Sequence, residues 1–171
     1  MEKLEIICET LKTPFGQLTI MVNRDQSTTV VGAGFGSVKD LANRIKVTRP
    51  SIAISNGKLP QEISNAVTSW LDGNHRAFTK LKFDQIGTDF RQECWAAMRT
   101  IKPGQVISYA ELAQKTSSPT AVRAAATACA QNLIAPLIPC HRIVKTGGSL
   151  GKYGYGETVK RKLLEFEGVY L

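Results

Sequence analysis

Pro139-Cys140-His141-Arg142-Ile143-Val144 is the stretch of this 171-residue sequence from which the rest is best understood. It sets a thiol beside an imidazole, and Pro139 predicts that the segment stays out of any helix and runs extended. A cysteine is a weak nucleophile at neutral pH unless a base lies nearby, and His141 is one of only two histidines in the chain. A buried structural cysteine with a histidine beside it by chance would give the same pair. The surrounding residues must therefore distinguish a reactive thiol from a structural one.

The composition is that of an ordinary globular protein, with 43% hydrophobic and 21% charged residues. The length allows one domain or two small ones. No run is long and apolar enough to cross a bilayer, and the first residues lack the apolar stretch of a secretory signal. We therefore expect an intracellular protein, cytoplasmic or located at the nucleoid or nucleus, without a membrane partner.

The cysteines and histidines argue against a metal centre. The four cysteines are Cys8, Cys94, Cys129 and Cys140, and no two of them form a CxxC pair. With only two histidines besides, a four-ligand zinc site is not expected. We predict no metal and no cofactor, and thiols of which at most one is reactive.

The net charge of +8 favours a polyanionic partner. The excess of lysine and arginine is larger after residue 86 than before it, so the C-terminal half is the better candidate surface. Charge alone is a weak signal, because many proteins are basic without binding nucleic acid.

The first third of the chain predicts β-strands. A turn at 13–16 leads into the alternating run 17–22, and a second β-prone run at 28–31 follows a polar turn at 23–27. The glycines that come next are too irregularly spaced for a dinucleotide-binding loop; they are Gly32, Gly34 and Gly36.

A helix is predicted over 60–72, with Pro60 at its start and Gly73 at its stop. Its apolar residues recur at helical spacing; they are Ile63, Val67, Trp70 and Leu71. The polar, irregular stretch 74–88 that follows is the expected boundary between an N-terminal and a C-terminal domain.

From Asp89 onward the pattern predicts helices. The first has an apolar stripe of Phe90, Cys94, Ala97, Met98 and Ile101 and ends before Pro103-Gly104. Ser108-Tyr109-Ala110-Glu111 is a capping box that starts a short helix through Gln114. After a tight turn, Pro119 is expected at the first position of another helix that ends near Ala130. Two short helices joined by a tight turn in a basic region predict a helix-turn-helix.

The second helix of that pair has an unusual surface. The stripe expected to pack inward is Val122, Ala125, Ala126 and Cys129. The opposite side is small except for one arginine; it consists of Thr120, Arg123, Ala124, Thr127 and Ala128. Helices that read bases usually present several long polar side chains, so this face is better suited to a backbone or a shallow groove, with Arg123 as a probe. A solvated arginine on a small helix is the alternative.

The last helix is predicted over 157–167 and ends at Gly168. Its inward stripe is Val159, Leu163, Phe166 and Glu167. A buried carboxylate needs a partner, and His141 is the natural candidate. Fraying of the last turn, which would leave Glu167 in water, is the alternative.

The order of these residues resembles the O6-alkylguanine-DNA alkyltransferases, also called methylated-DNA–protein-cysteine methyltransferases. The matching residues are Tyr109, Arg123, Asn132, Pro139-Cys140-His141-Arg142, Tyr153 and Glu167. Ser-Tyr-Ala-Glu-Leu-Ala, Ala-Val-Arg-Ala and Leu-Leu-Glu-Phe-Glu-Gly also stand where the family has them. The resemblance is strong over 88–168, whereas before that only the turn and strand at 13–18 are similar.

The resemblance implies a mixed α/β (α+β) protein. Its small strand-rich domain, of ribonuclease H-like type, would span 1–80. A helical C-terminal domain with the helix-turn-helix and an active-site loop would span 88–171. The implied partner is double-stranded DNA carrying O6-alkylguanine, bound through the minor groove by a monomer.

The implied reaction is a single irreversible transfer of an alkyl group from O6 of a flipped-out guanine to Cys140. His141, joined to the thiol through a water and held by Glu167, would be the base. Tyr109 would give a proton or hydrogen bond to the purine. Asn132 would fix the turn before the active-site segment.

The implied DNA contacts lie on the second helix of the helix-turn-helix, apart from Tyr109 on the first. Arg123 would fill the gap that the extruded nucleotide leaves. The remaining contacts would come from Thr120, Ala124, Thr127 and Tyr109. The implied substrate pocket would include the carbonyls of Cys140 and Ile143, the walls Tyr153 and Gly154, and Lys160, which would close the site by bonding to neighbouring backbone.

The sequence departs from the family pattern in three places. Asn132 is followed by Leu133 where the family usually has proline. Ala125, Ala126 and Thr127 stand where one or two glycines are common, and Gly154 stands where a serine or other small residue is often found. None of these removes a reacting group, but they bear on rate and on the size of the alkyl group accepted.

Three other functions fit parts of the pattern. A non-catalytic alkylguanine-binding relative normally lacks the cysteine, which is present here. A Cys-His thiol hydrolase would need direct contact between neighbours that point to opposite sides of an extended segment. A helix-turn-helix transcription factor would need a richer base-reading face.

Overall fold

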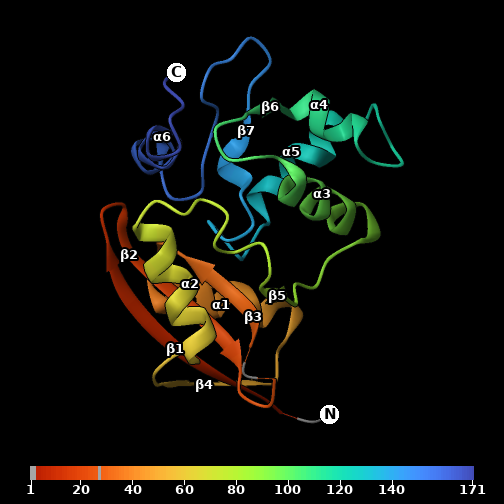
Figure 1. Ribbon diagram of the computed structural model, residues 1–171. Helices are drawn as coiled ribbons and strands as arrows, with labels where there is room; N and C mark the ends of the chain where they lie inside the picture. The colour runs from red at the N-terminus through yellow and green to blue at the C-terminus, as the bar shows by residue number, and fades with distance from the viewer. Residues whose placement is uncertain (1–2, 27) are drawn as a thin grey trace. The chain divides into compact units, whose positions relative to one another are not determined.

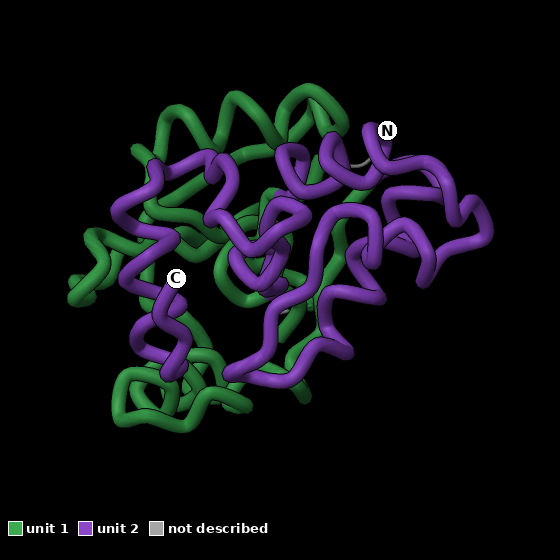
Figure 2. The backbone as a smooth tube through the Cα atoms, turned by 90° about the horizontal axis from the view of Figure 1, so that it is seen from above, with its two compact units in different colours: residues 1–86, 133–137 green, residues 87–132, 138–171 purple. Residues whose placement is uncertain are grey.

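The computed structural model describes residues 3–26 and 28–171. It divides into two compact units, one of residues 1–86 with 133–137 and one of residues 87–132 with 138–171 (Figure 2). The first is rich in strands and the second in helices, which confirms the predicted mixed fold class. The segment 133–137 belongs to the first unit, whereas the sequence places it inside a continuous C-terminal domain.

The first unit is built on a five-stranded sheet with the order β4-β1-β2-β3-β5 (Figure 1). Neighbours β1–β2 and β2–β3 are antiparallel, whereas β1–β4 and β3–β5 are parallel. The elements are β1 (Leu4–Thr13), β2 (Gly16–Asn23), β3 (Thr29–Gly34), α1 (Val38–Thr48), β4 (Ile52–Asn56), α2 (Gln61–Leu71) and β5 (Lys82–Phe83). The predicted strand 17–22 lies within β2 and the run 28–31 overlaps β3, while Ser27 of the predicted turn lies outside the described residues.

Helix α1 was not predicted, because only three of its residues are buried in the core of this unit. They are Leu41, Ala42 and Ile45, and they pack in one cluster with sheet residues that include Ile6 and Met21. Gly32 makes this packing possible: a Cβ at that position would lie 2.5 Å from Cδ1 of Ile45. The glycine that does not fit a dinucleotide loop is therefore a point of close approach between α1 and β3.

Helix α2 confirms the predicted helix at 60–72 to within a residue at each end. Pro60 precedes it, and Gly73 follows with φ +102°, a left-handed conformation that glycine adopts at little cost. Trp70 on its buried face packs against Phe15 and Phe78, each with 5.3 Å between ring centroids. This aromatic cluster anchors α2 to the unit.

The segment 133–137 is tied to the sheet unit by backbone hydrogen bonds. Ala33 donates to the carbonyl of Leu133 at 2.8 Å, and Ala135 donates to the carbonyl of Ala33 at 3.1 Å. The amide of Leu133 donates to Oε1 of Gln85 at 2.5 Å. Proline has no N–H, so the departure from the family pattern at Leu133 supplies a bond that proline could not make.

The second unit contains the predicted helix-turn-helix. Its elements are α3 (Asp89–Thr100), β6 (Ile107–Ser108), α4 (Tyr109–Gln114), α5 (Val122–Ala130), the 3-10 turn η1 (Cys140–Arg142), β7 (Ile143–Val144) and α6 (Glu157–Phe166). Ser108 caps α4 as its sequence predicts, with Oγ accepting from the amide of Glu111 at 3.1 Å. Strands β6 and β7 pair in parallel, so Ile107 lies opposite Ile143.

Two details of the predicted helices are wrong. Helix α5 begins at Val122, because Pro119 and Thr120 form a turn in which Ala121 donates to the carbonyl of Ser118. Its buried face is Ala125 and Ala128, whereas Val122 is exposed. The cause is a tertiary contact: Nε1 of the buried Trp95, which the predicted stripe of α3 omits, donates to the carbonyl of Ala128 at 2.9 Å. Phe90, which that stripe includes, is only half-buried.

Among the described residues, no helix is long and apolar enough to cross a membrane.

Candidate active site

Cys140 lies at the start of η1, the 3-10 turn that leads into β7. The expected extended conformation is therefore wrong: the amide of Arg142 donates to the carbonyl of Pro139 at 3.1 Å, and that of Ile143 donates to the carbonyl of Cys140. Pro139 is compatible with this turn because it precedes the first turn residue. Cys140 is not in a disulfide and has 6% of its surface exposed, so little solvent reaches it.

His141 and Glu167 are hydrogen-bonded, with 3.0 Å between Nε2 and Oε1. Both side chains are 3% exposed, although Glu167 is the capping residue just after α6. The carboxylate is thus directed inward, and the alternative in which the last turn frays into water does not hold. On the other side of the ring, Nδ1 of His141 is buried and makes no hydrogen bond within the described part of the chain.

Arg142 completes this cluster, in a role that no local sequence signal indicates. Its Nε lies 3.0 Å from Oε2 and 3.2 Å from Oε1 of Glu167, and its Nη2 lies 2.7 Å from Oε1. Its Nη1 donates to the carbonyl of Ile101 at 2.8 Å. The arginine within the Pro-Cys-His-Arg motif therefore faces the same carboxylate as the histidine, a bidentate pairing that guanidinium geometry favours.

The electrostatics of the cluster set its protonation states. Burial by itself would raise the pKa of Glu167, but the hydrogen bonds and charges of His141 and Arg142 outweigh it and lower the pKa to about 2. Burial lowers the pKa of His141, and the positive charges of Arg142 and Lys160 lower it further against the opposing effect of Glu167. Glu167 is therefore ionised and His141 neutral at pH 7. Because Nε2 faces a carboxylate, it carries the proton, and Nδ1 has the free lone pair of a base.

Lys160 is almost completely buried, with 1% of its surface exposed. Its Nζ donates to the carbonyl of Ile143 at 2.6 Å and to that of Lys152 at 3.3 Å. It also lies 5.9 Å from the centre of the Tyr109 ring. Lys160 thus joins β7 to the loop before α6, as a residue that closes the site would, and its bond occupies one lone pair of the Ile143 carbonyl.

Two tyrosines lie near the thiol. Burial raises the pKa of Tyr109 to about 12, helped by repulsion from Cys129 and Cys140 when these are ionised. Burial also places the pKa of Tyr153 well above its ordinary value, again with a contribution from Cys140. Both hydroxyls therefore keep their protons at neutral pH and can act as donors.

The glycines of the loop beside these tyrosines differ in what surrounds them. A Cβ at Gly151, whose φ is +78°, would lie 3.1 Å from the Tyr109 hydroxyl oxygen and 3.4 Å from Lys160 Nζ. Gly151 is thus a site residue that sequence reasoning missed, although a glycine in a short loop was the available signal. A Cβ at Gly154 would meet nothing within 4 Å.

Asn132 lies at the other end of the active-site segment. Its Nδ2 donates to the carbonyl of Ile138 at 2.9 Å, and the residue is 3% exposed. The bond closes the loop between α5 and the segment that carries Cys140, so the side chain links the end of the helix-turn-helix to the thiol.

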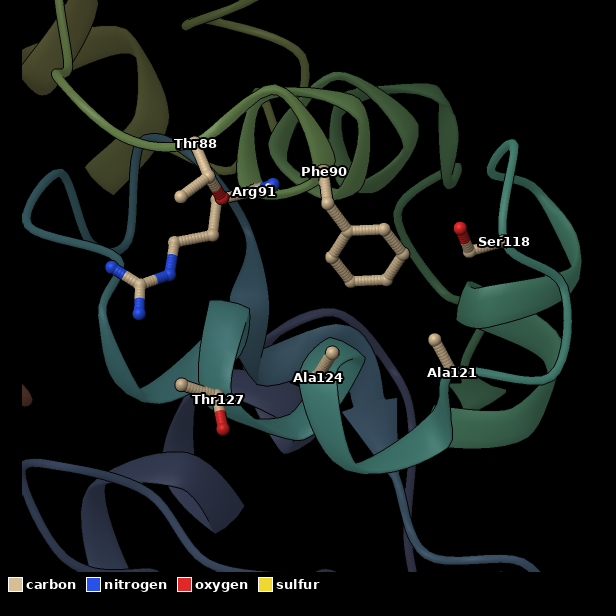
Figure 3. A pocket seen from close by; sticks show the side chains of 7 residues that line it. All are labelled: Thr88, Phe90, Arg91, Ser118, Ala121, Ala124 and Thr127. Carbon is tan, nitrogen blue, oxygen red and sulfur yellow. Dashed lines mark hydrogen bonds between the residues drawn. The ribbon is translucent and has the colours of Figure 1, made fainter.

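The exposed face of α5 carries the predicted DNA contacts. Arg123, Ala124 and Thr127 are exposed on this face, as is Thr120 in the turn before the helix, whereas Ala128, expected on this side, is buried. Beside this face lies a hollow of about 410 Å³ between α5 and the start of α3 (Figure 3). Figure 3 shows the ring of Phe90 directed into it, with Arg91 at the end near Thr127. Arg91 is a second cation at this face, and sequence reasoning did not single it out.

No cluster suited to a metal ion is present among the described residues, in the sense of three or more His, Cys, Asp or Glu side chains brought together.

A helix-turn-helix and a buried thiol beside an imidazole–carboxylate–guanidinium cluster define a nucleic-acid-directed transferase with a cysteine acceptor. Residues 89–169 match the family model described as the 6-O-methylguanine DNA methyltransferase, DNA binding domain. The methylated-DNA–protein-cysteine methyltransferase of Mycobacterium tuberculosis is 34% identical over 92% of this chain and 90% of its own length. The chain belongs to this family of DNA repair methyltransferases.

Two further similarities are consistent with this family. The bifunctional transcriptional activator/DNA repair enzyme Ada of Escherichia coli is 47% identical over 51% of this chain, which matches a quarter of that protein's length. The crystal structure of Mycobacterium tuberculosis OGT in complex with DNA superposes with a TM-score of 0.76 at 28% identity, covering 96% of this chain and 92% of that one.

Proposed function

We propose that this protein repairs DNA by direct reversal, transferring an alkyl group from O6 of guanine to Sγ of Cys140. The observation that carries the proposal is the placement of a buried thiol on the residue before His141, whose free Nδ1 and Glu167-bonded Nε2 suit a base. Family membership supplies the substrate class.

In the proposed reaction the Sγ–C bond forms as the C–O6 bond breaks. The thiol proton passes to Nδ1 of His141 through a bridging water, and the developing imidazolium is stabilised by the ionised Glu167. Tyr109 gives a proton to the departing purine, which leaves as neutral guanine, and the proton on His141 then returns through water to Tyr109. The product is a thioether, so Cys140 accepts one alkyl group and the protein acts once. Thiol, alkyl donor and proton acceptors account for every atom, so the reaction as proposed needs no cofactor.

We infer that the substrate base reaches Cys140 by rotation out of the duplex. Extrusion costs a few kcal/mol, and a side chain that fills the vacated stack offsets part of that cost. Arg123 is exposed on a face of otherwise small residues, which lets α5 approach the minor groove closely. Thr120, Ala124 and Thr127 would line that contact, and Arg91 beside them would meet a phosphate.

The substrate pocket proposed here consists of Tyr153, Gly154, Ile143 and Lys160. The carbonyls of Cys140 and Ile143 would accept from the exocyclic amine of guanine, and the lone pair of Ile143 that Lys160 does not use is available for this. Asn132 would hold the active-site segment at a fixed distance from α5.

The broader setting is also proposed. All the groups named come from the C-terminal domain, 88–171, of one chain, which favours a monomer acting on double-stranded DNA. The N-terminal domain, 1–80, would be of ribonuclease H-like type and would not enter the chemistry. We place the protein in the cytoplasm or at the nucleoid or nucleus, because its substrate is genomic DNA.

The test is to incubate the protein with a duplex that carries one O6-methylguanine and to weigh the peptide that contains Cys140. A gain of one methyl group on that peptide, with guanine restored in the DNA and no adduct in Cys140→Ala, supports the proposal. Binding of the duplex with an unmodified peptide would instead indicate a non-catalytic alkylguanine-binding protein.

A further inference from the structure

We propose that Arg142 is a positioning residue for the transfer reaction. Through its bidentate hydrogen bonds to Glu167, it holds His141 as the neutral tautomer with the proton on Nε2 and the lone pair on Nδ1. The inference rests on the proposed function of Cys140. It adds Arg142 to Cys140, His141 and Glu167, as a residue that acts on the base His141 through Glu167.

Arg142 makes a buried, bidentate pairing with Glu167 and not a surface ion pair; we call this pairing, together with the bond to the carbonyl of Ile101, the Arg142 clamp. Three nitrogen–oxygen distances of 2.7, 3.0 and 3.2 Å join its Nη2 and Nε to the carboxylate of Glu167. The side chains are 9% and 3% exposed, so solvent screens the pair very little. The remaining nitrogen, Nη1, is anchored on the carbonyl of Ile101 just after α3. Both the guanidinium plane and the carboxylate plane are thereby fixed.

The Arg142 clamp determines the protonation state of Glu167, and so whether Glu167 accepts a hydrogen bond from His141. Oε1 accepts from Nε and Nη2 of Arg142 and from Nε2 of His141, so a proton on Oε1 would conflict with all three donors. Glu167 must therefore stay ionised, and Nε2 must remain the protonated nitrogen of the imidazole. The lone pair then lies on Nδ1, the buried ring nitrogen without a hydrogen bond in the described part of the chain.

The clamp also sets how readily His141 becomes charged. Burial of the ring is the largest cause of the lowered pKa of His141; ionised Glu167 favours an imidazolium, and the guanidinium of Arg142 beside it opposes part of that effect. Lys160 from α6 adds a further positive charge, which also lowers the pKa of His141. Tyr109 on α4, Tyr153 in the loop and Cys129 on α5 lie near Cys140 and are protonated at neutral pH. The balance keeps His141 an unprotonated base until the thiol gives up its proton.

A lysine at position 142 could supply the same charge but not the same bidentate hydrogen bonds. An ammonium is a point donor, whereas a guanidinium spans both carboxylate oxygens and still reaches a third acceptor. Charge and geometry can thus be separated by two substitutions. Arg142→Gln removes the charge, and Arg142→Lys keeps the charge while losing the bidentate contact.

The experiment is a pH titration of ¹⁵N-histidine-labelled protein by NMR, which is well resolved because the chain has only two histidines. Nitrogen shifts report both the tautomer and the pKa of His141, and His75, in the other unit, is the internal reference. Arg161→Gln is the matched control: it also removes one arginine charge from the same unit, at an exposed pair with Glu157. The first-order rate of methyl transfer from excess duplex is measured over the same pH range, normalised to the fraction of active protein.

We expect wild-type His141 to be the Nε2–H tautomer at pH 7. In Arg142→Gln its pKa should rise by about one unit, and the acid limb of the transfer rate should move upward with it. In Arg142→Lys the pKa should stay near that of the wild type while the rate falls about tenfold or more. Arg161→Gln should match the wild type in both measurements.

A His141 pKa and tautomer unchanged in Arg142→Gln would overturn the inference, and so would a wild-type rate in Arg142→Lys. If Arg142→Gln does not fold, Arg142→Lys alone tests the inference. A slower methyl transfer, with the acid limb of its pH dependence at the wild-type position, supports a role for the bidentate contact. The titration does not depend on transfer, so a wild-type protein that takes no methyl group counts against the proposed function, while the shifts of His141 still test Arg142.

Discussion

Lys160 donates a hydrogen bond of 2.6 Å from Nζ to the carbonyl oxygen of Ile143, the residue that opens β7. A second bond to the carbonyl of Lys152 ties the same ammonium to the loop before α6. A lysine that is 1% exposed and has no carboxylate partner among the described residues is held by these carbonyls. Burial lowers its pKa. The cost of burying this charge indicates that its position matters to the site.

Lys160→Met should destabilise the protein by about 1–3 kcal/mol, because it leaves the buried carbonyl of Ile143 and the partly buried carbonyl of Lys152 without their donor. It should also slow methyl transfer, because the loop that carries Gly151 and Tyr153 is no longer tied to β7. Urea unfolding and single-turnover rates measure the two effects. Equal stability and equal rate in the variant would show that the ammonium does not hold the loop.

Acid should destabilise the protein through Glu167. Its pKa in the folded state is about 2, against an ordinary value of 4.5. A depressed pKa stabilises the fold above the unfolded-state value, and the stabilisation is lost as the pH falls from 4.5 toward 2. The shift corresponds to about 3 kcal/mol. His141 acts in the same direction at higher pH: its folded pKa is lowered, so protonation of the unfolded chain begins to destabilise the fold below pH 6.5.

The free energy of unfolding measured from pH 7 to pH 2 checks this expectation. Glu167→Gln, which cannot ionise, should lose stability at neutral pH and show a flatter dependence between pH 4.5 and 2. A variant that keeps the slope of the wild type would assign the acid sensitivity to other carboxylates.

Leu133→Pro should destabilise the protein although proline is what the family usually has there. The substitution removes the N–H that donates to Oε1 of Gln85, and we expect a loss of about 1 kcal/mol. Denaturant unfolding of the single variants and of the double variant with Gln85→Ala measures the coupling. If Leu133→Pro costs as much in the Gln85→Ala background as in the wild type, the hydrogen bond is not the cause.

Arg123→Ala should slow repair of O6-methylguanine in duplex DNA far more than the reaction with free O6-benzylguanine. The reason is that only the duplex has a stack to refill after extrusion. Rates on both substrates, with the Cys140 adduct as readout, measure the ratio. Equal losses on the two substrates would mean that Arg123 is not the extrusion probe.

Arg91→Ala is the comparison for that measurement. If Arg91 meets a phosphate, its loss should weaken binding of any duplex and reduce the slope of log affinity against log salt by about one, with no effect on free O6-benzylguanine. An unchanged salt slope would remove Arg91 from the DNA-facing surface.

Several parts of the fold were predictable because the signals are local. Ser108 and Glu111 are three residues apart, and that spacing suffices to start α4. The helical recurrence of Ile63, Val67 and Trp70 predicted α2 almost to the residue. The expected stripe of α6 left a buried Glu167 with a partner as one of two alternatives, and the structure supports that one, although the buried residues of the helix are Lys160, Leu163 and Leu164. In each case neighbours along one helix carry the information.

Other parts were not predictable, because they depend on contacts between segments far apart. The phase of α5 is set by Trp95, 33 residues before the carbonyl of Ala128 that it bonds. The segment 133–137 joins the sheet unit through Ala33 and Gln85, which nothing in its own sequence indicates. The three buried residues of α1 gave too narrow a stripe, and the helix packs close to Gly32, which lies on a strand, outside the pattern of the helix.

The sequence by itself determined which groups this protein possesses: a thiol followed by an imidazole, a helix-turn-helix, and a carboxylate at the end of the last helix. Only the tertiary structure decided how they act together. It turned the expected extended segment into a 3-10 turn, and it brought Arg142 to within 2.7 Å of Glu167, 25 residues away. The reason is physical: a residue's type and spacing fix its local conformation and chemistry, but its partner and charge state depend on which segments burial brings together.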